Sequence, residues 1–213
     1  MLSVSESIVL VGDSIFDNAP YVPGEPCVTE QLRAIVRDGV DVSMLAVDGG
    51  YVTDVHAQVK DLPAQVTHLF VSAGGNDALL YAQELATDYL TSEDLFIKWS
   101  AIQKEFRRNY RAMLEAVLAL GKHTVVCTIY DAVPSIDETE VTALSLFNDV
   151  ITAEAIFSGI PVVDLRRVCT EPSDYSPLSP IEPSSLGGAK IAATLNRVFE
   201  EHDFSSNRTS VFT

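Results

Sequence analysis

Short apolar runs alternate along this chain with longer stretches whose apolar residues recur at helical spacing. The first run, residues 7–11, is rich in β-branched side chains and ends at Gly12, which is typical of a strand buried on both faces. Further strands are expected at residues 40–47, 69–72, 125–129 and 160–164. Because parallel strands need right-handed crossover connections, this alternation predicts a parallel sheet with helices on both faces.

Helices are expected between the strands, over about residues 28–36, 91–120, 138–157 and 186–201. The longest begins at a possible capping box and stops at Gly121, and its aromatic side chains are interpreted as core packing. We therefore predict an α/β fold, a three-layer α/β/α flavodoxin-like sandwich with a five-stranded parallel sheet in the order 2-1-3-4-5. A single domain is expected over residues 1–203, and the polar residues 204–213 are expected to form a flexible tail.

Composition limits the partners of such a domain. The chain has 213 residues, of which 47% are hydrophobic, and this is enough for one sizeable core. Lys and Arg total 14 against 30 Asp and Glu, so the formal net charge is -16. A negative field repels phosphate backbones and anionic headgroups, so neither nucleic acid nor a membrane surface is expected as a partner.

The cysteines and the N-terminal residues indicate the cellular compartment in which the protein is expected. Cys27, Cys127 and Cys169 are odd in number and widely spaced, and no Cys-x-x-Cys pair occurs. Residues 1–6 carry no basic side chain, and the apolar run that follows is too short for a signal peptide or a spanning helix. We expect reduced thiols in a cytoplasmic protein, and no oligomeric state is predicted.

Three polar, glycine-containing turns follow the first three expected strands. They are Gly12-Asp13-Ser14, Asp48-Gly49-Gly50 and Gly74-Gly75-Asn76-Asp77. Ligands of open α/β sheets bind outside the carboxyl ends of the strands, so these turns are expected to meet at one functional edge. Each turn taken alone has a simpler interpretation as ordinary loop geometry, with the Asp and Asn side chains bonded to local backbone.

Taken together, the turns resemble in order and spacing the first three conserved blocks of the SGNH (GDSL-type) hydrolases, and Asn148 and residues 162–164 extend the resemblance over most of the chain. The resemblance implies an ester hydrolase acting on small acyl esters. In it, Ser14 is the nucleophile, and the oxyanion donors are the N–H groups of Ser14 and Gly49 and the side-chain amide of Asn76. A serine on a tight turn after a strand presents its hydroxyl, and acyl transfer needs such donors around the developing oxyanion.

The family's last block, an Asp-x-x-His, is altered. Ser179 stands where the resemblance implies the aspartate, and Glu182 stands where it implies the histidine. A glutamate with a reference pKa of about 4.3 is roughly two units weaker as a base, unless burial raises that pKa. By analogy with sedolisin peptidases, which pair serine with glutamate, Asp174 is a conceivable carboxylate behind Glu182.

The four histidines offer one alternative base. His56 follows Gly49 and could lie at the functional edge, although a solvated histidine at a helix start is the commoner case. The other three, at positions 68, 123 and 202, are expected at the opposite edge of the sheet.

The leading hypothesis is an ester hydrolase that uses Ser14, Gly49, Asn76 and Glu182. The alternative is a catalytically impaired SGNH-like protein that binds a small-molecule ligand. A flavodoxin-like cofactor binder is disfavoured because no hydroxyl-rich phosphate loop follows the first strand. No cofactor and no metal are expected, since the chain has neither a P-loop nor a His-Glu-x-x-His motif.

Overall fold

The computed structural model describes residues 6–213, and these form one parallel six-stranded sheet in the order β2-β1-β3-β4-β5-β6. The strands are β1 (Ser7–Gly12), β2 (Asp41–Met44), β3 (His68–Ser72), β4 (His123–Cys127), β5 (Val162–Val163) and β6 (Val211–Phe212). Every neighbouring pair is parallel. The predicted α/β class and the order of the first five strands are confirmed, and a sixth strand is added beside β5.

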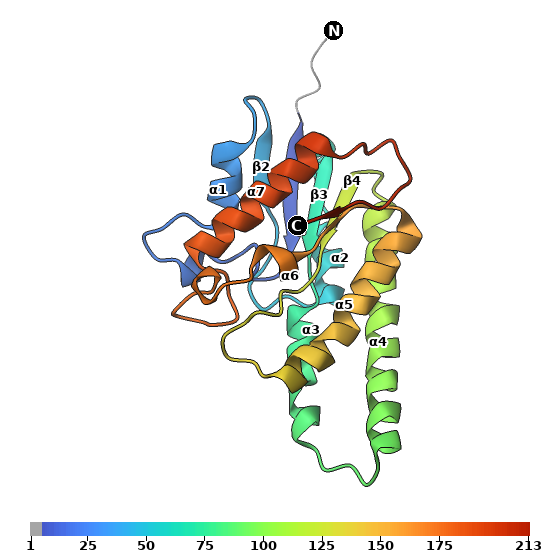
Figure 1. Cartoon of the computed structure of the whole chain (residues 1–213). Helices are drawn as coiled ribbons and strands as arrows, with labels where there is room; N and C mark the ends of the chain where they lie inside the picture. The colour runs from blue at the N-terminus through green and yellow to red at the C-terminus, as the bar shows by residue number, and fades with distance from the viewer. Residues whose placement is uncertain (1–5) are drawn as a thin grey trace.

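Helices cover both faces of the sheet (Figure 1). The α-helices are α1 (Val28–Ile35), α2 (Val55–Gln58), α3 (Gly75–Leu80), α4 (Ser92–Leu118), α5 (Glu138–Ser158), α6 (Leu165–Val168) and α7 (Ser185–Glu201), and the 3-10 helices are η1 (Ala19–Tyr21), η2 (Val52–Asp54), η3 (Ala82–Ala86) and η4 (Pro172–Asp174). The pair α1 and α7 packs on one face, and α2, α4 and α5 pack on the other. The helices α3 and α6 were not expected, because six and four residues are too few to show a helical period.

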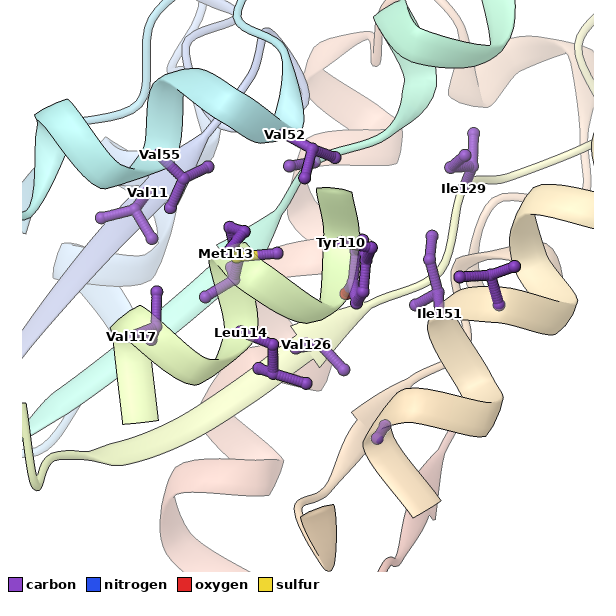
Figure 2. Close-up of a cluster of buried hydrophobic side chains, with 14 of the residues drawn as sticks. Val11, Val52, Val55, Tyr110, Met113, Leu114, Val117, Val126, Ile129 and Ile151 are labelled. Atoms are coloured by element: carbon purple, nitrogen blue, oxygen red, sulfur yellow. The ribbon is translucent and has the colours of Figure 1, made fainter. Parts of the chain in front are cut away.

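Alternation along the strands builds two separate cores. Val9 and Val11 of β1 point towards α2, α4 and α5, whereas Ile8 and Leu10 point towards α1 and α7. Figure 2 shows the first core, in which side chains of α4 such as Met113 meet those of the strands and of α5. Both faces of the central strands are therefore apolar, as a parallel sheet buried on both sides requires.

The long helix α4 extends past the carboxyl edge of the sheet, and α3 and the segment that joins it to α4 run alongside (Figure 1). Its N-terminus is fixed by Thr91, whose side chain accepts a hydrogen bond of 3.1 Å from the backbone N–H of Asp94. This helical extension forms a wall beyond the ends of the strands, on the side where the three polar turns lie.

The end of the chain differs from the predicted flexible tail. β6 pairs with β5, and Arg197 of α7 donates a hydrogen bond of 2.7 Å to the carbonyl of Thr213. Phe204 packs edge-on or tilted against the rings of His68, His123 and His202. The prediction failed because it judged residues 204–213 by their polarity, whereas a two-residue strand and one aromatic anchor hold the segment.

One helix has the dimensions of a membrane span. Within the part of the chain that the structure describes, α5 is the helix whose length and mean hydropathy would allow it to cross a bilayer. Core helices of other proteins meet the same criterion, and α5 packs Phe147 and Ile151 into the first core. Packing against the sheet and α4 therefore explains part of its apolar composition, whereas Ile156 and Phe157 near its end are exposed.

The aromatic anchor can be tested by Phe204→Ala. The side chain is half-buried among three histidine rings, so its loss is expected to reduce the free energy of unfolding by about 2 kcal/mol, roughly half the cost of truncating a fully buried phenylalanine. Phe157→Ala is the matched control, since Phe157 is 82% exposed and its removal should change little. Equal denaturant midpoints for both variants would contradict the anchoring role of Phe204.

Candidate active site

The Ser14 turn depends on a glycine at the end of β1. Gly12 has a φ of +124°, and a Cβ at this position would lie 1.7 Å from the carbonyl oxygen of Ser72 on β3. The next backbone N–H, that of Asp13, donates to the same carbonyl at 2.9 Å. Only glycine allows this close approach of β1 to β3. The chain then turns sharply and leaves Ser14, 6% exposed, beyond the carboxyl end of the strand.

The second and third turns lie beside the first. The Asn76 side-chain amide at the start of α3 donates a hydrogen bond of 3.0 Å to the carbonyl of Gly50. An amide NH₂ has two protons, so one remains for a further acceptor. Across residues 6–213, the N–H groups of Ser14 and Gly49 have no hydrogen-bond partner. Three donors are thus available at this edge of the sheet.

Two side chains, one buried and one partly buried, hold the turns together. The Asp77 carboxylate accepts a hydrogen bond of 3.0 Å from the backbone N–H of Val52, which joins α3 to η2. Gln58 of α2 bonds both the N–H and the carbonyl of Gly12, each at 2.7 Å. The role of Gln58 was missed in the sequence, because it stands on a short helix that carries no motif.

Glu182 lies on a loop that is fixed at several points. Its N–H donates to the carbonyl of Ser179 at 3.0 Å, and its carbonyl accepts from the N–H of Ser176 at 2.8 Å. The hydroxyl of Tyr130, which follows β4, donates to the carbonyl of Ile181 at 2.6 Å. Asn18 donates through Nδ2 to the carbonyl of Pro183 at 3.1 Å. Ser179 thus belongs to the turn that presents Glu182.

Glu182 is buried, with only 5% of the residue exposed to solvent. Burial raises its pKa to about 7, a hydrogen bond with the Ser14 side chain opposes the rise, and the negative charge of Asp48 adds to it. Its Oε2 atom is buried and has no hydrogen-bond partner among the described residues. The structure therefore brings Ser14 and Glu182 together and gives the carboxyl group a pKa near neutrality.

Asp13 is a second buried carboxyl group beside Ser14. Burial raises its pKa to about 8, a hydrogen bond from the backbone N–H of Ile15 opposes the rise, and the charges of Glu182 and Asp77 add to it. The predicted local backbone contact of Asp13 is therefore present. What the sequence did not indicate is that Glu182 lies close enough to Asp13 for its charge to raise the pKa of Asp13.

The other expected candidates lie elsewhere. His56 is exposed on α2 and does not line the pocket that contains Ser14. The histidines at positions 68, 123 and 202 gather around Phe204 at the amino edge of the sheet, as expected. Asp174 does not stand behind Glu182, because both of its oxygens lie 2.7 Å from Nζ of Lys190 and one also accepts from the N–H of Glu171.

Ser14 and Glu182 open onto a pocket of about 110 Å³ at the carboxyl edge. Its lining comes from the first and third turns, from the segment after β4, from the Glu182 loop, from the helical extension and from α5: Asp13, Ser14, Ile15, Gly75, Asn76, Ala78, Leu79, Ala82, Leu85, Trp99, Ile129, Tyr130, Val133, Ile136, Glu140, Ala143, Leu144, Phe147, Ile181 and Glu182. Gly49 of the second turn is not among the lining residues. The predicted interpretation of Trp99 as core packing was incomplete, since this side chain also faces the pocket. Its helical spacing gave no signal of that second role.

The fold and the pocket define a three-layer α/β/α protein with polar turns at the carboxyl edge of its sheet, and comparison with known proteins extends this description. The family model for the GDSL-like lipase/acylhydrolase family matches residues 10–188, so the chain belongs to that family. The protein is therefore an enzyme of the hydrolase class. A search of curated protein sequences found no match.

Solved structures with the same fold include several ester hydrolases. A lipase from a goat rumen metagenome has a TM-score of 0.70 at 22% identity, over 93% of this chain and 99% of its own. An acetyl xylan esterase variant from Geobacillus stearothermophilus has a TM-score of 0.68 at 17% identity, over 93% and 96%. An extracellular lipase from Streptomyces rimosus has a TM-score of 0.65 at 18% identity, over 91% and 99%. At these identities the likeness concerns the fold.

The raised pKa of Asp13 predicts a stability change that depends on pH. The folded state keeps a proton on Asp13 between the ordinary carboxyl pKa and about 8, so stability falls as pH rises through that window. Asp13→Asn keeps an acceptor for the Ile15 N–H but has no charge to bury. We expect its Tm to match that of the parent at pH 4 and to exceed it by roughly 5 °C at pH 8.5. For a chain of this size, that Tm difference corresponds to a gain of about 1.5–2 kcal/mol in the free energy of unfolding.

Thermal unfolding at both pH values is the measurement, with the exposed Asp61→Asn as control. A Tm difference that stays constant from pH 4 to pH 8.5 would show that Asp13 does not retain a proton in the folded state.

Proposed function

We propose that this protein hydrolyses small acyl esters, with Ser14 as nucleophile and Glu182 as general base. The observation that carries the proposal is the buried Glu182 carboxyl group, held beside the Ser14 side chain with a pKa of about 7. A base is most effective when its pKa lies near the working pH, and burial brings this glutamate there. The N–H groups of Ser14 and Gly49 and the Asn76 amide are proposed as the oxyanion donors.

In the first half of the reaction, ionised Glu182 accepts the hydroxyl proton of Ser14 while Oγ attacks the ester carbonyl carbon. The C=O electrons move to the carbonyl oxygen, and the three donors stabilise the resulting oxyanion. The carbonyl then re-forms, the bond to the alcohol oxygen breaks, and the leaving alkoxide takes the proton from Glu182. The acyl group remains on Ser14.

In the second half, a water molecule replaces the alcohol. Glu182 accepts a proton from this water as its oxygen attacks the acyl carbon, and the same donors stabilise the second oxyanion. Collapse breaks the bond to Oγ, and Glu182 returns the proton to Ser14. The products are the free alcohol and a carboxylic acid, and the enzyme is restored.

The nucleophile assignment predicts covalent labelling of Ser14. A fluorophosphonate should add one adduct to the protein, because its tetrahedral phosphorus centre places an oxygen near the donors. Intact-protein mass spectrometry followed by peptide mapping is the measurement. Ser14→Ala should remove the adduct with little change in Tm, since the substitution removes a single oxygen atom from a turn.

Folded protein that takes up no adduct at Ser14 after long exposure would exclude the hydrolase mechanism. The protein would then be a family member that binds its ligand without turning it over.

The base assignment predicts that Glu182→Gln lowers kcat/KM for p-nitrophenyl butyrate by about 10²–10⁴-fold. In the parent enzyme, kcat/KM should rise with pH around the Glu182 pKa of about 7, because only the ionised carboxylate accepts a proton. A histidine base would give a similar profile, so the variants decide between them. His56→Ala should be nearly neutral, and loss of activity in His56→Ala with retention in Glu182→Gln would transfer the role to His56.

A further inference from the structure

A second cavity, of about 200 Å³, lies at the amino edge of the sheet and shares no lining residue with the pocket that contains Ser14. Its walls come from the end of α4, the start of β4, the end of α5 and the segment between α7 and β6. In Figure 1 this last segment, drawn in red, passes from the end of α7 to the end of α5 before it returns to β6. The hydroxyl of Thr209 holds it there by donating a hydrogen bond of 3.2 Å to the carbonyl of Ala155.

The ionisable side chains of this cavity are basic. Lys122, His123 and His202 line it, and within residues 6–213 no Asp or Glu does. The pocket at the carboxyl edge is the opposite case, since its charged lining is entirely acidic. The formal net charge of -16 repels anions at long range, but at physiological ionic strength charges are largely screened beyond about 8 Å. The basic side chains that line the cavity therefore determine how it interacts with a small ion.

The acid nearest to this cavity along the chain is already engaged. Asp203 follows His202, and its Oδ1 atom accepts hydrogen bonds from the N–H and the hydroxyl of Ser205, at 3.0 and 2.6 Å. Those two bonds stabilise the carboxylate within its own turn. The lysine and the two histidines that line the cavity are thus not paired with a carboxylate from the described residues.

Hydrogen-bond donors line the cavity from three segments of the chain. Nζ of Lys122 donates one hydrogen bond, of 2.9 Å, to the carbonyl of Ala64, so two of its three protons remain. Among residues 6–213, the side chains of His202, Ser158 and Ser206 make no hydrogen bond to another protein group. An ammonium group, an imidazole ring and two hydroxyls are therefore available to one ligand.

We propose that this cavity binds a small tetrahedral oxyanion, either inorganic phosphate or the phosphoryl group of a phosphate monoester. A phosphoryl group carries about two negative charges at neutral pH and has three strong acceptor oxygens, which point in different directions. Donors from the start of β4, from the end of α5 and from the segment after α7 can each meet a different oxygen. A planar carboxylate has one charge and two oxygens, so it would leave donors of this cavity unused.

Binding can be followed at the cavity itself, because two of the four histidines of the chain line it. The experiment titrates the unaltered protein with inorganic phosphate at pH 7, at constant ionic strength, and records the imidazole ring protons by NMR. A nearby anion favours the protonated ring, so the signals of His123 and His202 should shift and saturate with a millimolar Kd. His56 is exposed on α2, outside the cavity, and serves as the internal reference. The signals are assigned with His→Gln variants.

Variants test the two kinds of donor. Lys122→Met removes the permanent positive charge and should raise the Kd for phosphate about tenfold. Lys60→Met is the matched control, since Lys60 is exposed after α2 and does not line the cavity, and it should leave the Kd unchanged. Ser206→Ala removes one hydroxyl from a surface segment without disturbing the core, and it should raise the Kd about threefold.

Glycerol 3-phosphate and acetate complete the titrations. Saturable shifts at His123 and His202 with phosphate or glycerol 3-phosphate, weakened in Lys122→Met but not in Lys60→Met, would support the site, and the tighter of the two ligands would identify the source of the anion. Acetate that binds as tightly as phosphate, equal shifts at His56, or equal Kd values in the two lysine variants would overturn it. Because no measurement uses ester hydrolysis, the result is independent of the proposed function.

Discussion

The contact between Gly12 and the carbonyl of Ser72 determines the geometry of the functional edge. It allows β1 to lie against β3 at its last residue and still turn at once, with Gln58 bonding the same glycine from α2. A side chain at position 12 would separate the strands, and the separation would move Ser14 away from the Gly49 and Asn76 turns. The position of the proposed nucleophile is therefore a consequence of backbone packing between two central strands.

The fold was largely predictable from the sequence, because short apolar runs and helical periods are local signals. The meeting of the three glycine turns followed from the rule that parallel strands end at one edge. The pocket wall was not predictable, since Trp99 has the same helical spacing as the core residues of α4. The raised pKa values of Asp13 and Glu182 also could not be predicted, because they arise from burial by segments far apart in the chain.

The Glu182 loop shows how a glutamate can stand where the resemblance implies a histidine. Main-chain bonds to Ser179 and Ser176 and the hydroxyl of Tyr130 orient the loop, so the backbone needs no help from the side chain at position 182. The pKa of the carboxyl group is then set by its burial and by the neighbouring Ser14 and Asp48 side chains. Within residues 6–213 the buried Oε2 atom of Glu182 has no hydrogen-bond partner, and such burial favours the neutral, protonated form of the carboxyl group.

The stability of the molecule depends on pH at both edges of the sheet. At the amino edge, the dependence comes from the cluster of three histidines around Phe204. Burial lowers the pKa of His68 to about 4, so its contribution to stability is lost as pH falls from about 6.5 through that value. At the other edge, the repulsion between Asp13 and Glu182 is relieved as pH falls through about 8 and about 7. As pH falls from about 6.5 towards 4, stability is therefore gained at the carboxyl edge and lost at the amino edge, so the two edges of one sheet respond to acid in opposite directions.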